Sequence, residues 1–275
     1  MTAAQVEVPG GRLFVLDEGA GPPIVLIHAG VADLRSWDSV VPPLTAAGYR
    51  VVRYDNRGYG ASTTEDLEYS RQADLIAVLD ARRIGRAALV GNSMGGSAAI
   101  DTAIEHPERV VALVGVAAGL GGFEVEPTPA EKAIFEAYEQ VDAADPFDQE
   151  ALTDFEVRVW LDGPGQQAGR VDATIREAMR AMAAPLNTPG RIRGTAVPLD
   201  PPANDRLAGL RCPVLAVTGR LDFSDVTAAA ERLAVTAPDG KVVIWDDVAH
   251  MIGMEQPDRL AATIVDFLGP LERWA

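Results

Sequence analysis

The sequence is poor in cysteine and holds no long apolar run. Cys212 is the single cysteine among 275 residues, so no disulfide can form within the chain. No segment approaches the ~20 uninterrupted apolar residues that a membrane-spanning helix needs. The first residues, Met1 to Gln5, lack the basic and apolar regions of a secretion signal. We therefore expect a cytoplasmic protein without a membrane partner.

Positive charge is also scarce. The formal net charge is −16, and nearly all cations are arginine, because Lys132 and Lys241 are the only lysines. Such a surface repels nucleic acid and anionic membranes, so neither is expected as a partner. A hydrophobic content of 48% and a charged content of 23% are ordinary for one large domain with a substantial core.

Strand-like and helix-like patterns alternate along most of the chain. Two short strand patterns flank Pro9-Gly10-Gly11, which is a hairpin signal. The later apolar runs alternate with helical patterns and lie at residues 24–28, 50–54, 87–91, 110–117, 213–218 and 241–245. This order predicts an α/β fold with a mostly parallel, doubly wound sheet.

The strand patterns stop between Phe123 and Asp205. Three amphipathic helical patterns replace them, separated by prolines and by the turn Gly163-Pro164-Gly165. We expect residues 123–205 to form a mobile helical lid, or cap, over the carboxyl edge of a core made of residues 1–122 and 206–275. Most apolar residues of the cap should hold it on the core. Trp160, which ends a helical pattern before the turn, is expected to line the pocket.

The pentapeptide Gly91-Asn92-Ser93-Met94-Gly95 separates an apolar run from an Ala-rich stretch that continues to His106. This context predicts a strand, a tight turn and a helix, with the serine on the turn. Such a turn holds the serine in strained dihedral angles and projects its hydroxyl into a cleft. The helix that follows favours negative charge at its N-terminus. Ser93 is therefore the predicted nucleophile.

A serine hydroxyl needs a base, and the chain has three histidines. His106 lies at the far end of the predicted helix, roughly 20 Å from Ser93 at ~1.5 Å per residue. His28 closes a buried apolar run, where a packing role is expected. His250 follows a strand pattern in a short loop, which suits a base at the carboxyl edge of a parallel sheet. His250 is therefore the predicted base.

The third member should be a carboxylate between the nucleophile and the base in the chain, at another strand end. Asp222 fits, because it follows the strand pattern that ends at Thr218. It would fix the imidazole tautomer and stabilise the imidazolium. Asp225 competes, but its place suits the first turn of the next helix. Asp246 and Asp247 share the strand end of the histidine and would reach its ring with difficulty.

With these residues identified, the chain resembles the single-domain, lidded α/β-hydrolases over nearly its whole length. The segment Ile27-His28-Ala29-Gly30-Val31 resembles their His-Gly oxyanion loop. Residues 54–62 resemble the Asp-x-Arg-Gly-x-Gly-x-Ser loop, and residues 218–222 and 249–250 match the acid and base segments. The resemblance implies an oxyanion hole made by the backbone amides of Gly30 and Met94.

The sequence departs from the family pattern at two positions. Both changes are small and concern the geometry of the loops rather than the class of protein. Ala29 and Ala249 stand where many members of the family have glycine. Val31 and Met251 adjoin the oxyanion and base segments, and we expect them to line the substrate pocket together with Trp160.

A serine nucleophile disfavours the dehalogenase and epoxide-hydrolase branches of the fold, which resemble this chain but carry an aspartate at that position. The sequence predicts a serine hydrolase for a small ester or lactone, resembling enol-lactonases and small esterases. It predicts no metal and no organic cofactor, because no ligand cluster or phosphate-cradling loop is visible.

Three alternatives stay open. Carbon–carbon hydrolases of ring-fission products are similar around Ser93, but they carry a Gly-Pro-Gly segment and a tryptophan after the histidine. This chain has Ala29-Gly30-Val31 and Met251 at these places. Perhydrolase activity is a conceivable side reaction of the same acyl-enzyme. A ligand-sensing relative with slow turnover is the third alternative.

Overall fold

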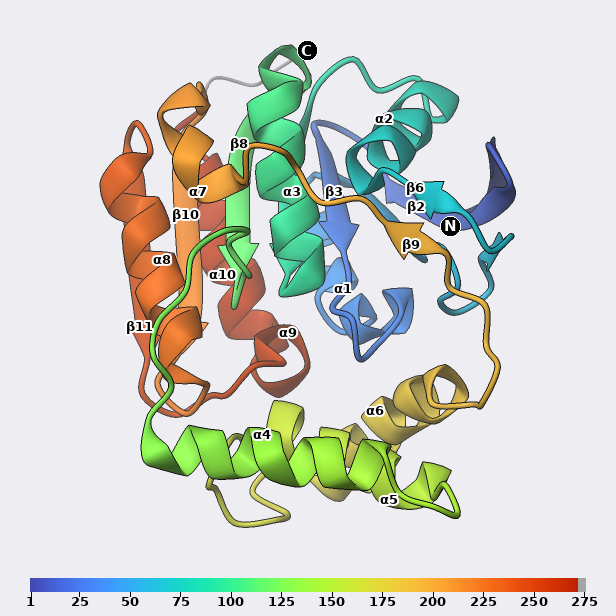
Figure 1. Cartoon of the computed structure of the whole chain (residues 1–275). Helices are drawn as coiled ribbons and strands as arrows, with labels where there is room; N and C mark the ends of the chain where they lie inside the picture. Colours follow the sequence, from blue (N-terminus) through green and yellow to red (C-terminus); the bar gives the residue numbers. More distant parts are fainter. Residues whose placement is uncertain (272–275) are drawn as a thin grey trace.

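A computed structural model describes residues 1–271, which fold around a nine-stranded sheet (Figure 1). Its strands are β1 (Thr2–Val8), β2 (Gly11–Gly19), β3 (Pro23–Ile27), β4 (Arg50–Tyr54), β5 (Thr63–Thr64), β7 (Ala87–Asn92), β8 (Val110–Val116), β10 (Val214–Gly219) and β11 (Gly240–Trp245). The order is β1-β2-β4-β3-β7-β8-β10-β11, with β5 beside β2. Pairs that include β2 are antiparallel and all others are parallel.

The strand pairing confirms the predicted, mostly parallel sheet. The apolar runs of its central strands are buried on both faces. All residues of β7 and β10 are buried, as expected for strands covered by helices on both sides. The hairpin between β1 and β2 is also present. Gly10 has a φ of 69° in its turn, a conformation that glycine adopts at little cost.

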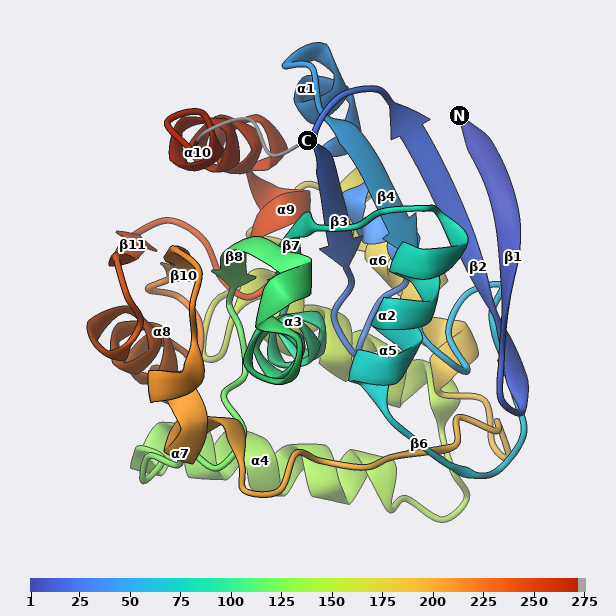
Figure 2. The ribbon, with the colours of Figure 1, turned by 90° about the horizontal axis from the view of Figure 1, so that it is seen from above.

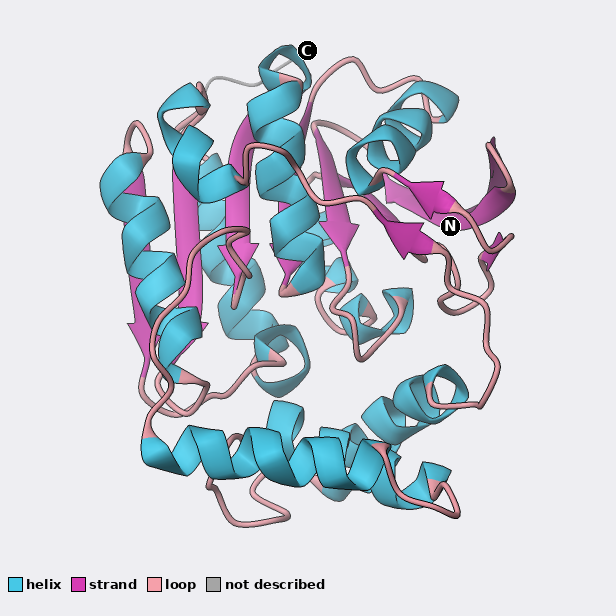
Figure 3. Ribbon diagram, in the orientation of Figure 1, coloured by secondary structure: helices cyan, strands magenta, loops and turns pink. Residues whose placement is uncertain are grey.

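Helices cover both faces of the sheet (Figures 2 and 3). They are α1 (Val41–Ala46), α2 (Arg71–Ala81), α3 (Met94–Glu105), α8 (Ser224–Thr236), α9 (Ile252–Glu255) and α10 (Pro257–Leu268). Leu75 of α2, Ile100 of α3 and Leu233 of α8 pack in one apolar cluster. Leu44 of α1 and Leu260 of α10 belong to a second cluster on the opposite face. This is the doubly wound arrangement that the sequence predicted.

The segment between β8 and the last part of the core is mostly helical. It contains α4 (Pro129–Asp142), α5 (Gln149–Val157), the π-helical turn η3 (Arg158–Asp162) and α6 (Ala173–Leu186). Figure 1 shows these helices beyond the carboxyl ends of the parallel strands. We call residues 123–205 the cap, and the assignment of this range as a separate unit remains a prediction.

Two details of the cap differ from the sequence-based expectation. Strand patterns were expected to be absent, but β9 (Thr195–Ala196) pairs in parallel with β6 (Glu68–Tyr69). A two-residue strand is too short to show a periodic pattern. The short helix α7 (Ala203–Arg206) crosses the expected boundary between Asp205 and Arg206. None of the helices within residues 1–271 has the length and apolarity that crossing a bilayer requires.

His28 has the packing role that its sequence context indicated. The ring is fully buried at the end of β3; its Nδ1 lies 2.8 Å from the Ala29 carbonyl, and its Nε2 accepts from the Asn56 amide at 2.9 Å. This arrangement requires a neutral ring that carries its proton on Nδ1. Burial lowers the pKa of His28 to about 4.

We expect the His28 ring to stay neutral in the folded protein as the pH falls from 6.5 to 5. The unfolded chain takes up a proton in this interval and the folded chain does not, so His28 reduces the free energy of unfolding as the pH falls. Nitrogen NMR of the imidazoles would follow its tautomer directly. An imidazolium signal from His28 at pH 5.5 in the folded protein would contradict the assignment.

Candidate active site

The turn between β7 and α3 holds Ser93 in a strained conformation. Its φ is 53° and its ψ is −115°, a region that residues with side chains seldom adopt. The turn is too crowded for side chains at its flanks. A Cβ at Gly91 would lie 2.1 Å from the Gly95 carbonyl oxygen, and one at Gly95 would lie 2.2 Å from the Ile27 carbonyl oxygen. Both glycines of the motif are therefore required by the geometry that presents the serine.

Asp222 and His250 form a close pair at the neighbouring strand ends. The Nδ1 atom of His250 lies 2.7 Å from Asp222 Oδ2, and both side chains are buried. The other carboxylate oxygen accepts from the Phe223 amide at 2.8 Å. With Nδ1 as donor to Asp222, the Nε2 atom of His250 is left to act as an acceptor.

The loop that carries His250 is tied to the serine turn through Asn92. The Asn92 side-chain amide donates to the His250 carbonyl at 3.2 Å and to the Val116 carbonyl at 3.0 Å. Within the described residues, Ser93 Oγ makes no hydrogen bond to His250. Such bonds are often long before substrate binds, and the bond from the Asn92 side chain to the His250 carbonyl keeps the two loops adjacent.

The other acidic candidates lie away from the imidazole. Asp225 is exposed in the first turn of α8. Asp246 pairs with Arg220, and Asp247 pairs with Arg259, both at the surface. Asp222 is therefore the carboxylate that the structure brings to His250.

The segments that hold Gly30 and Met94 also meet. A Cβ built on Gly30 would lie 3.8 Å from Met94 Cβ, and the hydroxyl of Tyr59 would lie at the same distance. Met94 is the first residue of α3, so its amide has no acceptor within the helix. The Met94 amide and the N-terminus of α3 therefore directly follow Ser93, and Gly30 lies against Met94. The role of the Gly30 and Met94 amides as an oxyanion hole stays a prediction.

The three residues predicted to line the pocket pack in one apolar cluster under the cap. Met251 is buried there, and Val31 and Trp160 pack against the cluster while staying partly accessible. The ring centroid of Trp160 lies 4.7 Å from that of His250 and 5.3 Å from that of Phe223. Trp160 therefore touches the predicted base itself.

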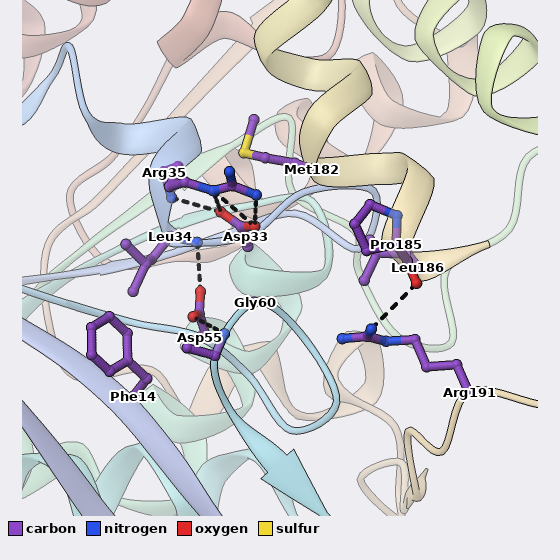
Figure 4. A pocket seen from close by; sticks show the side chains of 11 residues that line it. Phe14, Asp33, Leu34, Arg35, Asp55, Gly60, Met182, Pro185, Leu186 and Arg191 are labelled. Atoms are coloured by element: carbon purple, nitrogen blue, oxygen red, sulfur yellow. Dashed lines mark hydrogen bonds and ion pairs between the residues drawn. The ribbon is translucent and has the colours of Figure 1, made fainter. Parts of the chain in front are cut away.

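A hollow of about 300 Å³ lies between the core and α6 (Figure 4). The sequence analysis included Asp55 in the loop at residues 54–62 but did not predict a hollow beside it. Asp33 pairs with Arg35, and Asp55 accepts from the amides of Leu34 and Ala61. Burial raises the pKa of Asp55 to about 6. A second hollow of about 350 Å³ shares Arg35 with the first and is also lined by residues of the core and of α6. Both hollows therefore lie where the core meets the cap.

Glu131 of α4, which the sequence analysis missed, connects the cap to the loop that carries Asp222. Together with Thr128 it forms the capping box at the N-terminus of α4, and it also accepts from the amide and hydroxyl of Ser224 at 2.6 and 2.9 Å. Ser224 lies two residues after Asp222. The Thr-x-x-Glu pattern was visible as a capping box, but its second use needs the three-dimensional structure.

Comparison with known proteins identifies the family. Residues 24–263 match the model of the alpha/beta hydrolase family, so the chain belongs to this family, as the sequence resemblance predicted. A similar relative is 2-hydroxy-6-oxo-6-phenylhexa-2,4-dienoate hydrolase of Burkholderia cepacia. It is 28% identical over 94% of this chain and 91% of its own length.

Solved structures give the same fold. An N-acyl homoserine lactone degrading enzyme is 25% identical, with a TM-score of 0.74 over 96% of this chain and 100% of its own. The enol-lactonase of Burkholderia xenovorans LB400 has a TM-score of 0.74 over 97% of this chain and 100% of its own. At 22% identity, the second likeness supports the fold alone.

The geometry predicts different outcomes for the two nearby aspartates. Asp222→Asn should lower kcat by about 10⁴, because an amide at this place favours the wrong imidazole tautomer. Asp225→Asn should stay within about twofold of the wild type, because this exposed side chain does not reach the ring. Steady-state kinetics on an activated ester measures both. The opposite ranking would show that the acid is misassigned.

Trp160 should affect which substrates are preferred. We expect Trp160→Ala to change the ratio of kcat/KM between short and bulky acyl substrates by about tenfold, the scale of one apolar pocket contact. Phe135→Ala is the matched control. Phe135 also belongs to the cap and stacks on Phe223, with 4.9 Å between the ring centroids, but it is 38% exposed. A lower melting temperature with unchanged preference would make Trp160 only a packing residue.

Proposed function

We propose that this protein cleaves a small carboxylic ester or lactone through an acyl-enzyme on Ser93. As a member of the alpha/beta hydrolase family it is a hydrolase, and the proposal concerns the bond and the residues. The observation that carries it is the Asp222–His250 pair, 2.7 Å apart, at the same sheet edge as the strained serine. A nucleophile, a base and an orienting acid are the parts that serine acyl transfer needs.

In the proposed reaction, His250 Nε2 removes the proton of Ser93 as its hydroxyl oxygen attacks the substrate carbonyl. The amides of Gly30 and Met94 hold the tetrahedral oxyanion, and one such donor contributes about 10²–10³ in rate. The imidazolium, stabilised by Asp222, then protonates the leaving alkoxide. Water attacks the acyl-enzyme by the same route in reverse and releases the acid.

The surroundings of Ser93 favour a mainly apolar acyl group. Val31, Trp160 and Met251 belong to the apolar cluster between the oxyanion loop and the cap. The likeness to an N-acyl homoserine lactone degrading enzyme supports lactones as one substrate class to test. The apolar cluster and the likeness to a lactone-degrading enzyme both concern the kind of substrate. Neither changes the proposed catalytic steps.

Carbon–carbon bond hydrolysis is the second candidate, because the Burkholderia cepacia relative is a dienoate hydrolase that aligns with 94% of this chain. Ala29-Gly30-Val31 and Met251 stand where, by the resemblance given in the sequence analysis, hydrolases of that kind carry Gly-Pro-Gly and a tryptophan. These departures make the ester or lactone reading the first choice. A direct comparison of substrates decides between them.

A substrate panel should include p-nitrophenyl esters, simple lactones and a dienoic ring-fission diketone. We expect the highest kcat/KM on an ester or lactone, and Ser93→Ala should lower turnover by about 10⁴ without loss of fold. Preference for the diketone would favour the second candidate. Turnover that survives Ser93→Ala would contradict the serine mechanism, and circular dichroism checks that the variant is folded.

A further inference from the structure

Arg170 of the cap is joined to the loop that carries His250. Its guanidinium donates from Nη1 to the Asp247 carbonyl at 3.1 Å and forms an ion pair through Nη2 with Glu255. The same side chain donates to the carbonyls of Leu161 and Asp162 at 2.8 and 2.6 Å, at the end of η3. Arg170 therefore joins the end of η3 in the cap to residues that precede and follow His250.

Glu255 completes the connection. Its side chain is 3% exposed, and Oε1 accepts from the Ala249 amide at 2.9 Å while Oε2 faces Arg170. Ala249 directly precedes His250. The carboxylate therefore bonds the peptide unit that leads into the base. Burial raises the pKa of Glu255, and the hydrogen bond and positive charge of Arg170 oppose that rise.

The turn that follows η3 in the cap also packs against the loops that carry Asp222 and His250. Gly163, which follows η3, has a φ of 105°. A Cβ at this position would lie 2.5 Å from the Leu221 carbonyl oxygen and 3.1 Å from Ala249 Cβ. Leu221 precedes Asp222, so the cap backbone sits between the acid and base segments. Trp160, three residues earlier, packs on the imidazole.

We propose that Arg170 and Glu255 are positioning residues that couple the docked cap to the orientation of His250. The inference rests on the proposed role of His250 as base. Arg170 aligns the end of η3, Glu255 holds the Ala249 amide, and together they keep the imidazole against Asp222. The segment 158–170 is then a fixed support of the base, and mobility of the cap is confined to its other parts.

Arg170→Lys tests this coupling, because lysine keeps the charge but cannot donate in four directions from one plane. We expect kcat to fall about tenfold or more on a short p-nitrophenyl ester, with KM changed less than about twofold. Arg170→Gln should lose at least as much. The acidic limb of its kcat/KM profile should also move to lower pH, because a loosened imidazole loses the stabilisation of its cation by Asp222.

The sign of that pH shift separates positioning from a simple charge effect. Removing a cation near a base raises the pKa of that base if nothing moves, so an acidic limb of Arg170→Gln that moves to higher pH would overturn the proposal. The charged groups that act on Glu255 are Arg170 and Asp222, and Asp222 is also the charged partner of the imidazole. Unchanged kcat in both Arg170 variants, with only a lower melting temperature, would also overturn it.

A double-variant cycle and a matched control complete the test. Because the two residues belong to one connected network that ends at the Ala249 amide, Arg170→Gln combined with Glu255→Gln should cost little more than the larger single loss. Additive losses would contradict a shared action. Arg259→Gln is the control, since it removes an exposed cation that bonds Asp247 of the same loop, and its kcat should stay near the wild type. Activity that survives Ser93→Ala contradicts the proposed function, whereas activity that depends on Ser93 but not on Arg170 contradicts only the coupling.

Discussion

The strained turn at Ser93 is the constraint on which the site depends. Its φ of 53° is possible because Gly91 and Gly95 leave space for backbone atoms of the turn and of the neighbouring β3. The same turn places Ser93 directly before the N-terminus of α3, at the carboxyl end of β7. Strain of this kind persists only where the surroundings hold it, and here buried strands on both sides supply that support.

Residues from several parts of the chain hold His250, the proposed base, and the peptide unit before it. Asp222 bonds the imidazole ring, Asn92 bonds the His250 carbonyl, Glu255 bonds the preceding amide, and the tilted ring of Trp160 packs against the imidazole. Two of these contacts depend on the cap, directly or through Arg170. The coupling that we propose would make substrate selection and the orientation of His250 depend on the same cap segment.

Most of the fold could be predicted because it leaves local patterns in the sequence. The apolar run at 24–28 became β3, and the glycines of the pentapeptide marked the turn at Ser93. Strand β9 was missed, since two residues carry no period. The contacts of Arg170 and Glu255 were missed for a different reason: the residues lie 85 positions apart, and neither belongs to a motif. Ion pairs between residues far apart in the chain leave no local signal.

Covalent trapping tests the central claim, that Ser93 is an activated nucleophile, most directly. A small fluorophosphonate should add one equivalent to the folded protein, and peptide mass spectrometry should find the adduct on Ser93. Asp222→Asn should slow the addition strongly, because the base loses its orientation. Addition at another residue, or full loss of activity without an adduct on Ser93, would contradict the account.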